Sequence, residues 1–493
     1  MTSDAASPET DPQRWRVLAV CLAAGFITLL DVSIVNVAMP SIQNALHASA
    51  SALQLVVAGY TLAFGLVLVP AGRLGDAGHR RSLFLIGLVA FALASLGAGL
   101  APGDTWLAVA RLVQGACAGI VSPQVTGYIQ QEFRGFERAR AFGMFGAVVG
   151  VATAIGPLLG GLLIQAFGEQ NGWRWVFGIN VPIVAVVLAV AVRVVPRTGA
   201  VRRSALDPVG LVGIAATTVA VMVPFVLTTG TGDSPARWWF LPLGVALGAA
   251  TILWERRYER RGQDPVLSPE VLGLRSFRFG ALLGLAYFSG FTSVFLVITL
   301  FLQDDLGLSA LQAGLVGLPF AVASGISALA SGRAVARWGR PVVVVALCVV
   351  VVGLVGTDLA IRIIGAAPDR TALLCVVVAT TQCVAGAGSG LVIAPNQTLT
   401  LAEVPVRRAG MAGSMLQVGQ RIGSAVGISA VLAVFYGAQA SGESGSTAVG
   451  RGLLITIGLV LCALVVALLD ARRRAVRSRD EEVDAPRAER ETA

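Results

Sequence analysis

Charged side chains are scarce in this chain of 493 residues. Asp, Glu, Lys and Arg make up only 13% of it, while 55% of the residues are hydrophobic and the mean hydropathy is +0.77. A soluble protein of this size carries about 25% charged residues. The composition therefore excludes a soluble globular protein. It predicts an all-α polytopic membrane protein, because strands cannot cross lipid without closing a barrel.

Lys is absent altogether, and all 37 basic residues are Arg. We read this as a bias of the coding sequence rather than as chemistry. The net charge of +9 does not indicate nucleic-acid binding, because the arginines fall beside the apolar segments. The first 12 residues are polar and acidic and lack the basic region of a cleaved signal peptide, so none is expected.

Ligands for a metal ion are also few. The two histidines, His47 and His79, lie far apart in loops, and we expect no metal site and no cofactor. The six cysteines show no metal-ligand spacing and are expected to be small buried hydrophobes within apolar runs: Cys21, Cys117, Cys348, Cys375, Cys383 and Cys462.

The apolar runs predict fourteen membrane-spanning helices, since a span needs ~20 apolar residues. Their approximate ranges are 15–39, 51–72, 82–101, 105–130, 139–167, 173–195, 207–229, 238–256, 277–302, 310–334, 341–363, 371–400, 410–436 and 450–471.

Arginines alternate along the connections between these runs. Thirty arginines lie in every second connection, counted together with the segments before the first span and after the last. Five lie in the intervening connections, and Arg111 and Arg421 lie within spans. Positively charged connections stay in the cytoplasm, so both termini are predicted to be cytoplasmic and the number of spans to be even.

The two halves of the chain resemble each other. Ser-Ala-Leu-Gln opens both the second span, from Ser51, and the tenth, from Ser309, and Gly-Arg ends both. Internal repeats in a polytopic protein indicate a transporter with its substrate site between the repeats. The seventh and eighth spans have no counterpart and are interpreted as an inserted pair. The predicted units are 1–198 (N-terminal segment and six-helix bundle), 199–262 (inserted pair), 263–472 (second bundle) and 473–493 (charged tail, expected to be disordered).

Asp31 lies well inside the first apolar run. A carboxylate at that depth faces a protein interior or a water-filled path, and it either bonds a neighbouring helix or forms a proton or substrate site. Arg111, in the fourth run, either snorkels to the helix end or stabilises a nearby carboxylate, for which Asp31 is the obvious candidate. We favour the second interpretation.

Small residues and proline mark the fifth run. Gly146, Gly150, Gly156, Gly160 and Gly161 recur at helical spacing, which allows another helix to approach closely. Pro157 removes one backbone hydrogen bond and permits a bend. The sixth run opens with Trp173 and Trp175, which suit the membrane–water boundary.

Four motifs together resemble the major facilitator superfamily, and within it the fourteen-helix drug:proton antiporters, over nearly the whole chain. They are Leu30-Asp31 through Asn36 to Pro40, Gly72 to Arg81, Arg111-x-x-Gln114-Gly115, and Gly156-Pro157-x-x-Gly160-Gly161. The second departs from the family pattern, because Ala77 replaces an Arg and the turn is one residue short.

The resemblance implies roles for these residues. Asp31 and Arg111 would couple transport to protons, and the fifth-helix glycines with Pro157 would form a hinge typical of exporters. A latch between the halves would consist of Gly72, Asp76, Gly78, Arg80 and Arg81. The implied mechanism is alternating access by two rocking six-helix bundles.

The resemblance also bears on the cargo, because cation exporters of this family usually carry extra acidic residues in the membrane and the tenth span has none. It implies a neutral, zwitterionic or weakly anionic amphiphile. We expect the protein to lie in the cytoplasmic membrane as a monomer in contact with lipid. We do not expect it to be an enzyme. The alternatives are a proton-coupled importer and a non-transporting ligand- or lipid-binding membrane protein. Candidate cavity-lining residues form a mixed aromatic and amide set: Asn36, Gln54, Tyr60, Gln124, Tyr287, Phe288, Phe291, Phe295, Gln382, Asn396 and Gln417.

Overall fold

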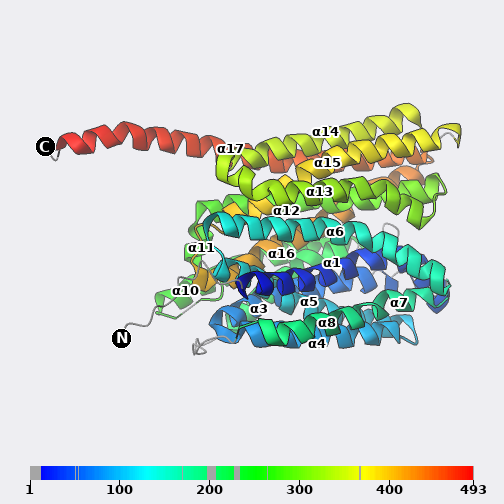
Figure 1. The fold of residues 1–493 in the computed structure, drawn as a ribbon, viewed down its shortest axis with the longest axis horizontal. Helices are drawn as coiled ribbons and strands as arrows, with labels where there is room; N and C mark the ends of the chain where they lie inside the picture. Colours follow the sequence, from blue (N-terminus) through cyan, green and yellow to red (C-terminus); the bar gives the residue numbers. More distant parts are fainter. Residues whose placement is uncertain are drawn as a thin grey trace.

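The computed structural model describes residues 13–49, 52–53, 55–168, 170–196, 207–226, 234–263, 265–365 and 368–491, of which 304, 310, 439–440 and 473–491 are described by their backbone only. Within these ranges every regular element is a helix. The helices lie side by side as one elongated bundle, and α1 starts at the end of the bundle from which α17 projects (Figure 1).

The helices of the first half follow the predicted runs. Their bounds are α1 Gln13–Leu46, α3 Tyr60–Leu74, α4 Arg80–Gly99, α5 Asp104–Glu132, α6 Gly135–Phe167, α7 Gly172–Gly178 and α8 Asn180–Val194, with π-helical turns at Leu55–Gly59 and Gly75–His79.

The remaining helices complete the bundle. They are α9 Pro208–Val226, α10 Phe240–Arg260, α11 Pro269–Gly273, α12 Arg275–Leu300, α13 Ala310–Trp338, α14 Pro341–Ile364, α15 Thr371–Thr400, α16 Ala409–Ala440 and α17 Gly445–Glu491. Shorter turns lie at Pro235–Trp239, Phe301–Asp305, Pro368–Arg370 and Val406–Arg408.

Thirteen helical stretches of the described chain are long and apolar enough to cross a membrane. One of them, Leu55–Gly99, has 45 residues, and Gly78 breaks it with a left-handed φ of 107°. A straight helix of that length would measure about 67 Å, more than twice the hydrocarbon thickness. Counting its two parts, α3 and α4, separately adds one and gives fourteen spans, as predicted.

The end of the chain differs from its prediction. We expected disorder after Arg472, but α17 continues as a helix to Glu491 and projects from the bundle (Figure 1). The prediction took the charged, Ala-rich composition of the tail as typical of a disordered segment. Ala, Arg and Glu are also strong helix formers, and the helix is consistent with that propensity.

The two halves of the chain meet along α6, which packs between α1 of its own half and α13 of the other (Figure 1). A second contact brings α3 and α5 of the first half against α16 of the second. The α9–α10 pair packs beside α3 and α16, where Ser429 donates a hydrogen bond to the Phe225 carbonyl at 2.8 Å. The division of the chain at residues 198, 262 and 472 stays a prediction.

Close helix packing depends on individual glycines, and Gly427 illustrates it. A Cβ at this position of α16 would overlap the Ser289 carbonyl oxygen of α12. We expect Gly427→Ala to lower the free energy of unfolding by about 1–3 kcal/mol, the usual cost of overpacking. Thermal unfolding of the purified protein in detergent measures this.

Gly458 of α17 provides a matched control, because a Cβ there meets nothing within 4 Å. Gly458→Ala should leave the unfolding temperature unchanged or raise it, since Ala is the better helix former. Equal destabilisation by the two variants would contradict the packing argument.

Candidate functional site

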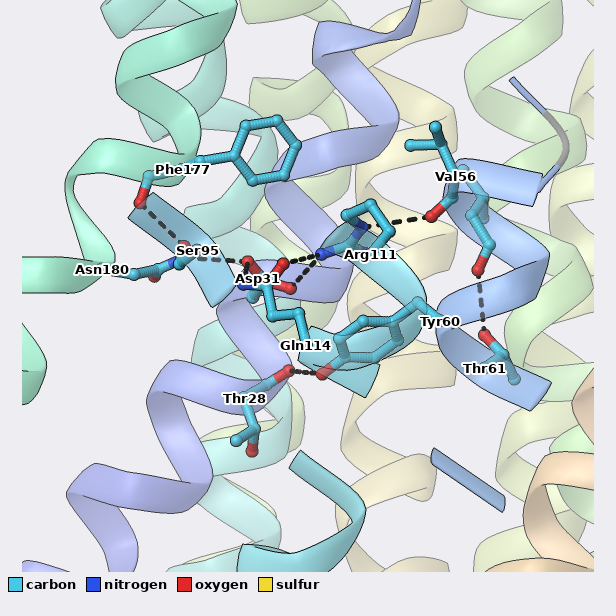
Figure 2. Close-up of polar contacts among 11 residues, drawn as sticks. Thr28, Asp31, Val56, Tyr60, Thr61, Ser95, Arg111, Gln114, Phe177 and Asn180 are labelled. Atoms are coloured by element: carbon cyan, nitrogen blue, oxygen red, sulfur yellow. Dashed lines mark hydrogen bonds and ion pairs between the residues drawn. The ribbon is translucent and has the colours of Figure 1, made fainter. Parts of the chain in front are cut away.

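Asp31 and Arg111 form an ion pair inside the first half of the bundle (Figure 2). An Arg111 guanidinium nitrogen lies 2.5 Å from Asp31 Oδ2, and the two residues are 0% and 1% exposed. Asp31 Oδ1 accepts two further hydrogen bonds, from Gln114 and Asn180, each at 2.8 Å. The carboxylate is therefore neutralised, fully hydrogen-bonded and closed to water in this conformation.

The neighbouring helices fix the position of the guanidinium. Arg111 Nε donates to the Val56 carbonyl at 3.1 Å, which lies in the π-helical turn ahead of α3. The Tyr60 ring lies 4.3 Å from the guanidinium, and the Tyr60 hydroxyl donates to the Thr28 carbonyl of α1 (Figure 2). Gly115 makes this arrangement possible, because a Cβ there would overlap the Tyr60 backbone. Three helices thus hold Arg111 in place.

Two members of this site, Asn180 and Ser95, were not predicted from the sequence. Asn180, at the start of α8, donates to both Asp31 and the Ser95 hydroxyl of α4, and Ser95 in turn donates to the Phe177 carbonyl (Figure 2). Both side chains are 0% exposed. An amide deep in an apolar run was a usable signal, because buried polar groups need partners, but nothing in the order of residues identifies Asp31 as that partner.

Pro157 in α6 is linked to α1 by a hydrogen bond. Proline lacks an N–H, so the Thr153 carbonyl four residues earlier loses its helical partner. Ser33 of α1 donates to this carbonyl at 2.9 Å. Gly156 leaves room for that contact, since a Cβ there would overlap the Ser33 hydroxyl. The Gly-Pro pair therefore docks on α1 only two residues from Asp31.

The α6 glycines face two different neighbours. A Cβ at Gly146 would lie 3.1 Å from Ala394 Cβ of α15, and one at Gly150 would lie 3.3 Å from the Ala321 carbonyl of α13. Gly156 and Gly160 instead face α1, where a Cβ at Gly160 would lie 3.1 Å from the Ile34 carbonyl. Gly161 lies near Leu311 of α13. Only part of the glycine set therefore faces the opposite half.

Asp76 joins the two halves at the end of the bundle where α1 begins. Its two carboxylate oxygens accept hydrogen bonds of 2.9 Å from the backbone N–H groups of Gly410 and Met411 in the first turn of α16. Arg80 also donates to Asp76 at 2.8 Å. A carboxylate at a helix N-terminus interacts favourably with the helix dipole. The contact joins the turn after α3 to the first turn of α16 and so connects the two halves at this end.

The other residues of the predicted latch surround this contact. Gly72 lets α3 meet α16, because a Cβ there would overlap Ser414 and the Gly410 carbonyl. Gly78 supplies the left-handed turn between α3 and α4. Arg80 also bonds Gln131 at 2.6 Å, whereas Arg81 bonds the Val192 carbonyl at 2.8 Å and takes no part in the contact between the halves.

The predicted cavity-lining residues are not brought together as one set. Several are buried and bonded between helices: Tyr60 to Thr28, Gln124 to the Ala71 carbonyl, Tyr287 to Ser389, Gln382 to Thr357 and Asn396 to the Gly280 carbonyl. Tyr287, Phe288, Phe291 and Phe295 form an aromatic cluster with Phe320. Gln417 bonds Ser122, Asn36 is exposed, and Gln54 lies outside the described residues.

We predict that Asp76→Asn opens the contact between α3 and α16. The amide loses the negative charge and one acceptor, and a hydrogen bond to a charged group contributes about 1.5–3 kcal/mol. That should shift the population of the open form at least ~10-fold. Spin labels at His79→Cys and Arg407→Cys, both exposed, in a background without the native cysteines, would report a longer distance.

Asp369→Asn is the control, because this carboxylate is exposed and its one ion pair among the described residues is with Arg370. The distance distribution should stay that of the parent protein. An unchanged distribution in Asp76→Asn as well would rule out the latch.

Comparison with known proteins places this geometry in a family. The family model of the Major Facilitator Superfamily matches residues 21–428 and 279–491. The chain is 34% identical to puromycin resistance protein pur8 of Streptomyces alboniger, covering 96% of this chain and 94% of that protein. It is 33% identical to the probable actinorhodin transporter of Streptomyces coelicolor, covering 88% and 74% respectively.

A solved structure shares the fold. The human organic anion transporter MFSD10 (TETRAN) superposes with a TM-score of 0.66 at 14% identity, covering 93% of this chain and all of that one. At that identity the likeness concerns the fold alone. Together with the family match, it identifies the chain as a multi-pass membrane transporter, not an enzyme, and as a member of the Major Facilitator Superfamily.

Proposed function

We propose that the protein exports antibiotic-like amphiphilic molecules in exchange for protons, by alternating access. The relatives named above, a resistance protein and a probable transporter of an antibiotic, support the class of cargo. The Gly-Pro pair of α6 supports export, since the resemblance associates it with antiporters. The observation that carries the proposal is the buried ion pair of Asp31 and Arg111.

Protonation of Asp31 would change the balance of charge in the first half. Removing one partner of a buried ion pair costs about 3–5 kcal/mol, because the other charge is left uncompensated. The conformation described here, with Asp31 sealed, therefore favours the ionised carboxylate. A neutral Asp31 favours a conformation in which Arg111 finds water or another anion.

The α1 helix connects the proposed protonation site, Asp31, to the bend at Pro157 in α6. Asp31 and Ser33 are two residues apart, and Ser33 holds the carbonyl freed by Pro157. A shift of α1 after protonation would strain or release that bond and so change the bend of α6. Because α6 packs on both halves, its bend sets their relative orientation.

We place the protein in the cytoplasmic membrane as a monomer, with both termini on the cytoplasmic side. The arginine distribution supports this orientation. The Asp76 contact then closes the cytoplasmic end. One net charge moving inward contributes ~2.3 kcal/mol per 100 mV, which corresponds to about a fifty-fold gradient of a neutral cargo at ~1.4 kcal/mol per decade.

We expect Asp31→Asn to abolish proton-driven efflux while the protein still inserts and folds. Proteoliposomes loaded with a fluorescent amphiphile and given an imposed pH gradient measure this, and the rate should fall at least ten-fold. Asp31→Asn leaves Arg111 without its counter-charge, so purified protein is first compared with wild type by gel filtration.

Asp358→Asn is the matched control, because it removes another acid of a membrane span, one that pairs with Arg362 four residues later. Its efflux should equal that of wild type. Unchanged efflux in Asp31→Asn would show that another acid carries the proton, and uptake of cargo along with protons would identify an importer.

A further inference from the structure

Arg421 is a cation in the middle of α16, far from either membrane surface. It follows Ala409, the first residue of α16, by 12 positions, which places it about 18 Å along the helix. The hydrocarbon layer is about 30 Å thick, so Arg421 lies near its centre. An arginine at that depth faces the protein interior or water, and a lipid headgroup does not reach it.

The Arg421 side chain contacts the opposite half of the protein. Its guanidinium carbon lies 4.4 Å from the centre of the Phe64 ring on α3, and Phe64 is itself 3% exposed. Arg421 is half-buried. Among the described residues no carboxylate lies within ion-pairing distance of it, in contrast to Arg111. The guanidinium therefore keeps its charge without a counter-ion from the protein.

A buried donor without a partner in the described part of the chain lies one helical turn away from Arg421. Gln417 is 7% exposed, and its Oε1 accepts a hydrogen bond of 2.5 Å from Ser122 of α5. Its Nε2 is buried and has no partner in the described part of the chain. Positions 417 and 421 share one face of α16. Two donors, one of them charged, thus lie together where the two halves meet.

The carboxylate on the far side of this aromatic contact, Asp31, is already engaged. Asp31 is neutralised by Arg111. The Arg111 guanidinium lies over the Tyr60 ring, and Tyr60 stacks on Phe64. Arg421 covers the Phe64 end of the same pair. The region therefore carries one net positive charge, and a buried charge is stable only when paired.

We propose that Arg421 and Gln417 form an anion subsite that binds the carboxylate, or a comparable single negative charge, of the transported amphiphile. The guanidinium supplies charge and paired N–H donors, which suit a carboxylate, and Nε2 of Gln417 supplies a further donor. The buried Phe64 ring packs against the guanidinium and holds it at this position. This inference rests on the proposed export function and narrows its cargo to amphiphilic monoanions.

The charge of the cargo determines how strongly the membrane potential drives its export. Exchange of one proton for one neutral molecule moves one charge, whereas exchange of one proton for one monoanion moves two charges in the same sense. At a given inside-negative potential the limiting concentration ratio of the anion is therefore the square of that of a neutral cargo. A subsite with a fixed cation suits this cargo.

The test uses 2-naphthoate and its uncharged analogue 2-naphthamide, both radiolabelled, with the purified full-length protein in detergent. We expect wild type to bind the carboxylate at least ten-fold more tightly than the amide. Arg421→Gln should remove this preference without weakening amide binding, Arg421→Lys should keep most of it, and Gln417→Ala should reduce carboxylate affinity several-fold.

Arg451→Gln is the control, because this exposed arginine pairs with Glu443 at the far end of the second half. It should keep the wild-type preference. The comparison of the two ligands on wild type needs no variant, so a misfolded Arg421→Gln leaves the proposal testable. Equal affinity of wild type for both ligands, or a preference that survives Arg421→Gln, would overturn it.

Transport separates this inference from the proposed function. A carboxylate preference in binding without flux under a pH gradient would refute proton-driven export and support the subsite. Proton-driven flux of naphthamide without any carboxylate preference would refute the subsite and support the export function.

Discussion

The ion pair between Asp31 and Arg111 is the constraint on which the first half of the molecule depends. Neither charge is stable alone at that depth in a membrane, so every neighbouring element is shaped to keep them together. A π-helical turn supplies the Val56 carbonyl, Gly115 admits Tyr60 beneath the guanidinium, and Asn180 satisfies the remaining lone pair. Five helical segments thereby become dependent on a single pair of opposite charges.

The second half is connected to that pair through α6 and α16. On α6, glycines allow contact with both halves, and the carbonyl freed by Pro157 is bonded to the helix that carries Asp31. On α16, the first turn is held by Asp76 and the middle faces the aromatic pair that lies under Arg111. Where Gly146 and Gly150 of α6 meet the second half, the contacts are made by backbone and small residues, which can slide without large rearrangement of side chains.

Much of this could be predicted from the sequence, for physical reasons that differ between features. The spans follow from hydropathy, and the limits of α15 match the predicted 371–400. The pairing of Asp31 with Arg111 follows because an apolar environment leaves opposite charges no other good partner. Asn180 could not be assigned, since many amides could satisfy one lone pair. The predicted cavity-lining set mixes residues bonded between helices, such as Gln124 with the Ala71 carbonyl, with the exposed Asn36, because composition does not reveal which side of a helix faces its neighbours.

The position of α16 has a mechanical consequence. A helix is stiff along its axis, so the two ends of this segment of α16 move together. Its first turn is held through Gly410 and Met411, and its middle carries Arg421. A displacement of α16 at Arg421 therefore also displaces its first turn, and no chain of intermediate side chains is needed. In the proposed scheme, cargo bound at Arg421 and the Asp76 contact are therefore linked directly through one helix.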